Sequence, residues 1–427
     1  MDLVCLIVSL VFFIILGVPL CFAMGASSLV YFMFNPAFLS MFPQRIWAGA
    51  NSPLMIALPL FILAGELMNS GGVTKRIIDF SSYIVRPFRG GLGEVNVIAS
   101  MIFGGISGSS VSDTSALGSV LIPEMKKKGF SLDYSAGITV ASSTIGMIIP
   151  PSIPMIMYSM ISGASIGALF LAGLIPGVLI GLTQTLLANI ASRKKNYPIE
   201  QGGVSCKGLI EKGKDGFLAL LMPVVIVISV SFGIATASES AGVAILYAFI
   251  LGILVYRELK IKDLKQMVKR TFISSSSVMI IIAYSLIFTW ILAIEQVPHA
   301  LGSFINGLEV NRIWILLLLD LLILIVGTFI DVSPALLLLC PILVPVMGAL
   351  GVNELHFGTI IIVGLAIGLV TPPIGMCLNA AAKLSGLSIT RIFRAASPFL
   401  ICNVIILLLV TFIPEISLWL PNLIMGR

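Results

Sequence analysis

Apolar stretches long enough to cross a lipid bilayer recur along almost the whole chain of 427 residues. A helix needs about 20 apolar residues to span the hydrocarbon core. Only 10% of the residues are charged, against about 25% in a soluble domain, so no segment is polar enough to form one. The sequence therefore predicts an all-α polytopic membrane protein. The candidate full spans are 3–34, 53–70, 134–163, 166–192, 217–233, 237–256, 271–294, 357–381 and 396–420.

The composition excludes several classes of protein. The chain has two histidines, and its six cysteines are scattered without the spacing of a metal site. The net charge of +6 comes from Lys and Arg in loops beside the spans, which is a signal of membrane topology. The Gly-rich stretches lack the Gly-Lys-Ser/Thr ending of a phosphate-binding loop. We therefore expect a lipid-embedded protein that is not an enzyme, binds no nucleic acid and does not itself use ATP.

The distribution of basic residues predicts the topology. Two further apolar stretches, 92–123 and 312–347, are each too short for two crossings and are interrupted in the middle. If each enters the membrane and returns, all five basic loops fall on one face, as the positive-inside rule requires. This count predicts two re-entrant hairpins from opposite faces, a cytoplasmic N-terminus and a C-terminus on the other side. The basic loops are 74–89, 126–128, 193–214, 257–270 and 383–394.

An internal repeat supports this topology. Residues 105–151 align with 327–373 at a constant offset of 222, and Pro150-Pro151 meets Pro372-Pro373. Several identities fall on Gly and Pro, which determine backbone shape. The predicted topology gives the two copies opposite orientations, which is the inverted repeat of a secondary transporter. The alternative is a coincidence between two apolar stretches.

The helical backbone is interrupted twice in each copy. Two turns rich in small and polar residues, 104–115 and 327–334, lie in the hairpins, and the two proline pairs must unwind the spans 134–163 and 357–381. Non-helical backbone occurs in the hydrocarbon region only where its N–H and C=O groups find hydrogen-bond partners or ligands. Hydroxyl and carbonyl oxygens suit an alkali or alkaline-earth cation, and the positive end of a half-helix suits an anion.

Simpler interpretations remain open for these interruptions. The first turn also fits a Gly/Ser helix-packing seam, and a proline pair also fits a kink. Asp331 lies in an apolar environment and is a functional candidate, although it also fits a capped acid at a turn. Asp113 lies in a more polar turn, where both interpretations apply equally.

With these motifs, the sequence resembles the large membrane subunit of the tripartite ATP-independent periplasmic (TRAP) transporters. The resemblance covers nearly the whole chain. It implies a sodium-coupled importer of the elevator type in the bacterial inner membrane, with a small membrane subunit and a periplasmic substrate-binding protein as partners. The motifs that carry it are Gly105–Ser109, Ile148–Pro154, Thr236–Tyr247, Asp331 with Pro334, and Gly368–Gly375.

The resemblance further implies a division of the chain and a set of binding residues. We expect scaffold helices in 1–90 and 193–311, transport-domain repeats in 91–192 and 312–395, and a C-terminal helix in 396–427. Carried over residue by residue, the family pattern places one Na+ at Ser107, Ser110, Gly146 and Ile149, a second at Gly327, Thr328, Gly368 and Thr371, and the substrate at Ser109, Ser152, Asp331 and Asn379.

The leading hypothesis is symport of sodium with a small organic acid, such as sialic acid or a C4-dicarboxylate, delivered by a binding protein. The first alternative is a stand-alone sodium–dicarboxylate symporter that needs no binding protein. A passive pore and an assembly subunit without a substrate are the remaining classes.

Overall fold

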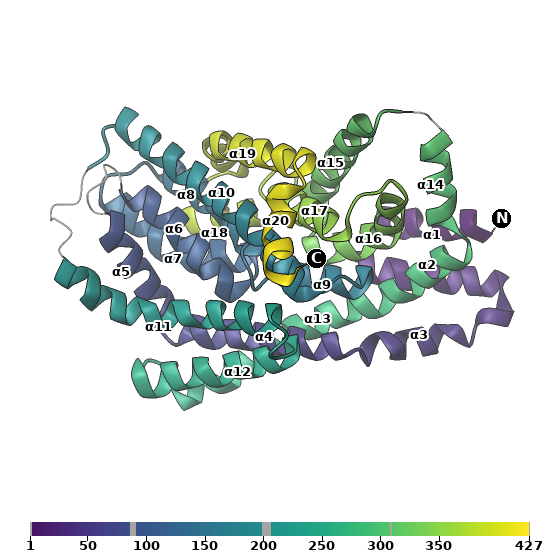
Figure 1. The fold of residues 1–427 in the computed structure, drawn as a ribbon, viewed down its shortest axis with the longest axis horizontal. Coiled ribbons are helices and arrows are strands. Elements are labelled where there is room, and N and C mark those ends of the chain that lie inside the picture. Colours follow the sequence, from purple (N-terminus) through teal and green to yellow (C-terminus); the bar gives the residue numbers. More distant parts are fainter. Residues whose placement is uncertain (1, 86–90, 199–205, 308–309, 427) are drawn as a thin grey trace.

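The computed structural model describes residues 2–85, 91–198, 206–307 and 310–426, and every regular element in these ranges is a helix. Six of the described helical segments are long and apolar enough to cross a membrane. The predicted all-α polytopic membrane fold is therefore confirmed (Figure 1). The six segments are α10 (Ile166–Lys194), Ala237–Val255, α13 (Ile261–Ile294), α15 (Arg312–Phe329), α16 (Val332–Ala349) and α19 (Ile389–Phe412).

The single span predicted at 3–34 is wrong. Two helices, α1 (Asp2–Ile15) and α2 (Leu20–Phe34), occupy this stretch and pack against each other. Gly17 has a φ of +79° and ends α1 in the left-handed conformation typical of a helix C-terminus, and Pro19 stands at the N-cap of α2. The cytoplasmic N-terminus was inferred from one crossing here, so the orientation of the termini stays a prediction.

The N-terminal helices form a separate packed group around α13. A short 3-10 helix, η1 (Pro36–Phe38), leads into α3 (Met41–Ala50), which is followed by α4 (Pro53–Ser70). The long helix α13 packs on α2, α3 and α4, and Figure 1 shows it running from the centre of the molecule to this group at one end. A distinct apolar cluster that includes Phe32 and Ile291 fills the space between them.

Both predicted hairpins are present. In the first, α6 (Gly91–Ser107) and α7 (Ser110–Lys127) are separated only by Gly108-Ser109. In the second, α15 and α16 are separated only by Ile330-Asp331. Because each of these two helices is long and apolar enough to cross a membrane, the prediction that 312–347 is too short for two crossings is wrong. Each hairpin therefore turns at the polar interruption that the sequence indicated.

Both predicted broken helices are also present. The first consists of α8 (Leu132–Ser143), the 3-10 helix η2 (Thr144–Met147) and α9 (Ile153–Ser162), and the second of α17 (Glu354–Gly368) and α18 (Met376–Ser385). Pro150-Pro151 and Pro372-Pro373 lie in the two breaks, and both bonds are cis. The unwound segments at the double prolines are therefore confirmed.

The two repeats interlock. Within each repeat the first hairpin helix packs on its own broken helix, α6 on α8 and α15 on α17. The second hairpin helix crosses to the other repeat, so that α7 packs on α18 and α16 packs on α9. The offset of 222 also relates the N-caps of α7 and α16, which are Ser109 and Asp331. Each repeat thus completes the core of the other.

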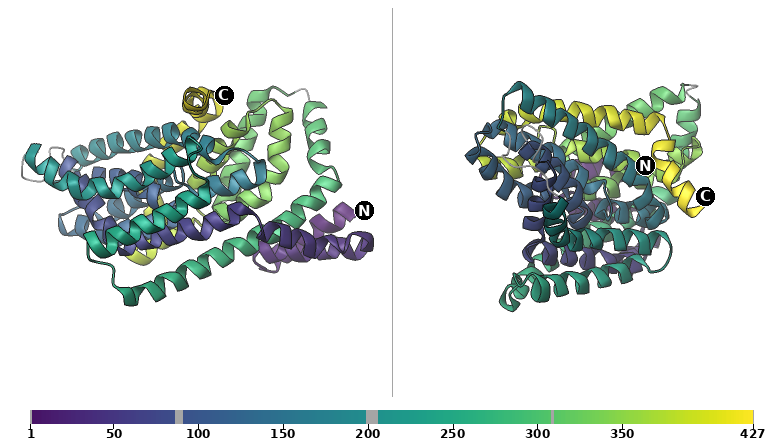
Figure 2. Two further views of the ribbon diagram at one scale, coloured as in Figure 1. Left: turned by 60° about the horizontal axis from the view of Figure 1, so that its bottom comes forward. Right: turned by 60° about the vertical axis from the view of Figure 1, so that its left-hand side comes forward.

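The remaining helices connect or cover these units. The predicted span 396–420 is divided at Pro414, where α19 ends and α20 (Glu415–Met425) begins; α20 packs on α10 at the outer edge of the molecule (Figure 2). Of the basic loop residues, Arg86, Arg89 and 199–205 lie outside the described residues. The connecting helices are α5 (Val73–Val85), α11 (Cys206–Ser231), α12 (Ala237–Ile250), the π-helical η3 (Leu251–Val255) and α14 (Val297–Gly307).

The division into scaffold and transport parts stays a prediction, and the contacts are compatible with it. Helix α4 packs along α12 and α13, whereas α10 and α19 pack on each other and on the broken helices. The connecting helices α5 and α11 pack on each other beside α6. Of these helices, α4 and α13 form one wall of the cavity described below.

The backbone contact between Gly327 and Gly368 gives the first prediction. A Cβ at Gly368 would lie 2.5 Å from the Cα of Gly327, so Gly368→Ala should lower the free energy of unfolding by about 1–3 kcal/mol through overpacking. A Cβ at Gly348 on α16 would meet nothing within 4 Å, so Gly348→Ala is the matched control and should be neutral or stabilising. Thermal unfolding in detergent measures both. Equal stability of the two variants would contradict the contact.

Candidate ion and substrate site

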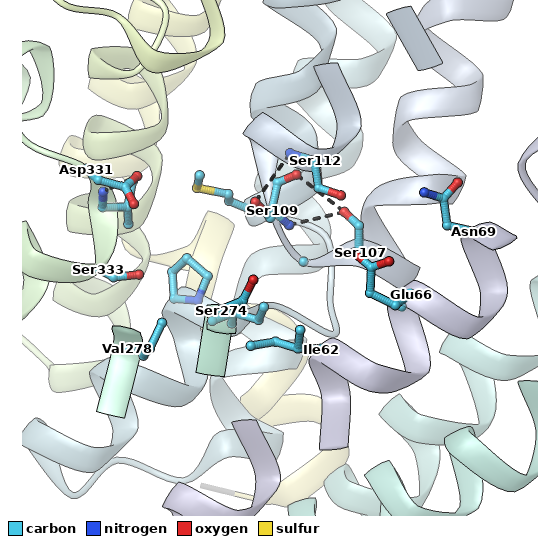
Figure 3. Close-up of a pocket in the computed structure, with 16 residues that line it drawn as sticks. Ile62, Glu66, Asn69, Ser107, Ser109, Ser112, Ser274, Val278, Asp331 and Ser333 are labelled. Atoms are coloured by element: carbon cyan, nitrogen blue, oxygen red, sulfur yellow. Dashed lines mark hydrogen bonds between the residues drawn. The ribbon is translucent and has the colours of Figure 1, made fainter. Parts of the chain in front are cut away.

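A cavity of about 310 Å³ lies where both hairpin turns meet α4 and α13. Figure 3 shows Asp331 and Ser333 of the second hairpin on one side, Glu66 and Asn69 of α4 on the other, and Ser109 between them. The volume is in the range of small-molecule sites. The lining residues are Ile62, Gly65, Glu66, Asn69, Ser107, Gly108, Ser109, Ser112, Met147, Ile153, Pro154, Ser274, Val278, Asp331, Val332 and Ser333.

Three helices have their N-termini at this cavity. Helix α7 begins after its N-cap Ser109, whose hydroxyl accepts from the N–H of Ser112 at 3.5 Å. Helix α16 begins after Asp331, whose Oδ1 accepts from the N–H of Val332 at 2.9 Å. Ile153 is the first residue of α9. Because helix N-termini carry partial positive charge and free N–H groups, this end of the cavity favours an anion.

The first predicted sodium set gathers around a carboxylate that the sequence analysis left out of that set. The Ser107 hydroxyl donates to Oδ1 of Asp113, and a Cβ added at Gly146 would collide with Oδ2 of the same side chain. Ser110 lies between Ser107 and Asp113 in the same hairpin and is fully buried. Ile149 differs: its N–H donates to the carbonyl of Ile145 at 2.9 Å, and its side chain lies against α10.

Two oxygens in this cluster lack partners. Oδ2 of Asp113 and Oγ of Ser110 are buried and have no hydrogen bond within the part of the chain that the structure describes. A buried oxygen without a partner costs about 1–3 kcal/mol, and more if it is charged. A small cation held by hard oxygens would offset that cost. The residues therefore fit a sodium ion between the first hairpin turn and the first break.

The second predicted sodium set is also brought together, but without an acid. The backbones of Gly327 and Gly368 touch, since a Cβ on Gly327 would lie 3.1 Å from the Cα of Gly368. Thr328 donates its hydroxyl to Ile325 at 2.8 Å, and Thr371 donates its hydroxyl to Ile367 at 2.9 Å. The repeat places Ala335 at the position of Asp113. Any cation here would depend on neutral oxygens.

The four predicted substrate residues separate into two pairs. Ser109 and Asp331 line the cavity. Ser152 is buried and donates to the carbonyl of Met147 at 2.5 Å, so it holds the first break and caps α9. Asn379 donates to the carbonyl of Ile374 at 2.7 Å and holds the second break. Neither Ser152 nor Asn379 is among the lining residues.

Sequence reasoning missed the wall formed by α4 and α13. Glu66, Asn69 and Ser274 line it, and the sequence analysis placed none of them in the site. No motif joins residues 66 and 274, because two helices far apart in the chain form this wall. Asp113 had a usable signal, since it is the one acid in the Gly/Ser-rich turn.

Comparison with known proteins agrees with this geometry. The transporter YdaH of Alcanivorax borkumensis, whose crystal structure was described as having an unusual topology, superposes with a TM-score of 0.64 over 91% of this chain and 90% of that chain. At 12% sequence identity this similarity concerns the fold alone.

Relatives of much higher identity cover the chain almost completely. It is 36% identical to the sialic acid TRAP transporter large permease protein SiaM of Vibrio cholerae, over 96% of both chains. It is 33% identical to the C4-dicarboxylate TRAP transporter large permease protein DctM of Pseudomonas aeruginosa, over 93% of both. The family model of the tripartite ATP-independent periplasmic transporter, DctM component, matches residues 7–416. The chain therefore belongs to the DctM family, the large permease subunits of TRAP transporters, and is a transport protein rather than an enzyme.

Proposed function

We propose that this permease imports a small organic acid together with sodium, in complex with a small membrane subunit and a periplasmic substrate-binding protein of the bacterial inner membrane. The observation that carries the proposal is the position of the unpartnered oxygens of Ser110 and Asp113, directly behind the hairpin turn that forms the cavity. The relatives named for sialic acid and C4-dicarboxylate transport support an organic acid as the substrate.

The geometry suggests how sodium and substrate are coupled. Ser107 lies in both sites: its hydroxyl donates to Asp113, accepts from the N–H of Ser109 at 3.2 Å, and lines the cavity. A cation at Asp113 would fix Ser107 and hold the hairpin turn against the break. The N-terminus of α7 would then be positioned for the anion before it binds. Binding of either ligand therefore favours binding of the other, since coupling between two sites is reciprocal.

The membrane potential would drive the cycle. Each sodium ion that enters down a potential of 100 mV releases about 2.3 kcal/mol. Both hairpins face α4 and α13 across the cavity, so the interlocked repeats would move as one body past these helices. This elevator movement is part of the proposal.

The sodium site gives the second prediction. Sodium, compared with potassium and choline at equal ionic strength, should stabilise the purified protein in detergent, by about 2.7 kcal/mol at a hundredfold excess over Kd. Asp113→Asn keeps the shape and the acceptor for Ser107 but removes the charge, so it should raise the apparent Kd for sodium at least about tenfold. Thermal unfolding over a sodium titration measures this shift.

A matched variant controls for the change of charge. Asp133→Asn removes a half-exposed acid that pairs with Arg391 at 2.8 Å and is not among the cavity residues. It should leave the sodium dependence unchanged. Identical curves in the three cations would contradict sodium coupling.

The requirement for partners gives the third prediction. Proteoliposomes that contain this chain and the small membrane subunit should accumulate the organic acid only when the binding protein and a sodium gradient are both present. Uptake by this chain alone would instead support a stand-alone symporter. Uptake that ignores the gradient would support a passive pore.

A further inference from the structure

The charges that face the cavity are all of one sign. Glu66 and Asp331 are the only charged side chains among its described lining residues, and both are acidic. The positive potential for an anion therefore comes from the N-termini of α7, α9 and α16 and from any bound cation. This is an unusual arrangement for a site that takes an acid, and it restricts which acids fit.

Glu66 differs from Asp331 in its hydrogen bonding. Oδ1 of Asp331 accepts from its own helix at Val332, so that oxygen already serves as a cap. The half-buried Glu66 carboxylate has no hydrogen bond or ion pair to any residue that the structure describes. Figure 3 shows it beside Ser107 at the edge of the cavity opposite Asp331. Its acceptor oxygens are therefore available to a ligand.

The surroundings of Glu66 are polar, and the acceptors they leave open to a ligand are the carboxylate oxygens of Glu66 and the hydroxyl of Ser274. Asn69, one turn further along α4, accepts at Oδ1 from the Thr74 hydroxyl at 2.8 Å, and Ser274 of α13 faces the same space. A ligand group that donates hydrogen bonds, such as a hydroxyl, an amide or an ammonium, satisfies this wall. A carboxylate placed there would meet a like charge at close range and lose its own hydration.

We propose that Glu66 is a specificity-determining residue, which selects monoanionic acids carrying hydroxyl, amide or ammonium donors over dicarboxylates. The inference rests on the proposed function, because it takes the cavity as the organic-acid site. The single carboxylate lies at the helix N-termini, and the donor-bearing part points to α4. Glu66 belongs to α4 and not to a hairpin, so it acts on the ligand only while the hairpin turns face α4.

Matched pairs of acids test this inference. D-gluconate and D-glucarate share the four hydroxyl groups at C2 to C5 and differ at C6, where a hydroxymethyl group is replaced by a carboxylate, and L-lactate and L-malate form a smaller pair. Thermal unfolding of the purified full-length chain in sodium, titrated with each acid, gives an apparent Kd. The unmodified protein should prefer the monoanion of at least one pair by about tenfold or more.

Variants assign the preference to the side chain. Glu66→Gln should reduce it to near equality by tightening the dianion, whereas Glu66→Asp should keep it. The matched control is Glu124→Gln, which removes an acid paired with Lys128 near the other end of α7 and should leave the preference unchanged.

The outcomes separate the inference from the function. If Glu66→Gln keeps the sodium-dependent shift and the original preference, Glu66 is only a solvated side chain and the inference is wrong. A preference for the dianions in the unmodified protein also overturns it. If sodium stabilises the protein but none of the acids nor N-acetylneuraminate adds to the shift in any variant, the cavity is not an organic-acid site, and the proposed function itself fails.

Discussion

The need to satisfy backbone N–H and C=O groups inside hydrocarbon determines most of this structure. Each unpaired group costs several kcal/mol there, yet the chain unwinds at two hairpin turns and two breaks. Side chains satisfy part of the backbone: Ser109 and Asp331 cap the returning hairpin helices, while Ser152 and Asn379 hold the carbonyls of Met147 and Ile374. Where glycines let two backbones touch, no empty space is left between the hairpins and the breaks. The site exists because these interruptions meet at one place.

The two repeats share a backbone plan but differ in charge. Gly105 and Gly327, and Gly146 and Gly368, occupy equivalent positions against the breaks. Asp113 has no acidic counterpart, since Ala335 takes its place. The proposed cation sites are therefore unequal, one with a buried carboxylate and one with neutral oxygens. The second repeat does carry acids, Asp320 on α15 and Asp331 at the hairpin turn, but neither occupies the position equivalent to Asp113.

Much of the fold was predictable, because its determinants are local. Double prolines fixed the breaks, Gly and Ser runs fixed the first hairpin turn, and the constant offset revealed the repeat. Thr236 and Glu239 form the capping box that begins α12, at the start of the motif Thr236–Tyr247. The two helices within 2–34 were missed, because the mean hydropathy of a window of apolar residues hardly changes at a single proline.

The site was predictable only where one segment supplies it. The family resemblance supplied Ser107, Ser110 and Gly146, and the structure places them together where the first hairpin meets its own break, although sodium binding there stays a prediction. The wall formed by Glu66 and Ser274 was not found, since the contact between α4 and α13 leaves no short motif. Ser152 and Asn379 have side chains that could bind a ligand, but each already donates a hydrogen bond to a backbone carbonyl within its break. Hydrogen bonding within a break and ligand binding draw on the same residue types, so sequence alone cannot separate them.

The exchange of hairpin helices between repeats has a consequence for biosynthesis. Helix α7 is inserted early and packs on α6 and α8 of its own repeat, but it also packs on α18, which is translated much later. At about 5–20 residues per second, this interval lasts on the order of tens of seconds. During it, the face of α7 at Gly118, which lies against Leu384 of α18 in the complete structure, lacks its final neighbour. The first half of the chain therefore emerges as an incomplete unit, whose interior is closed only when the last quarter of the polypeptide has entered the bilayer.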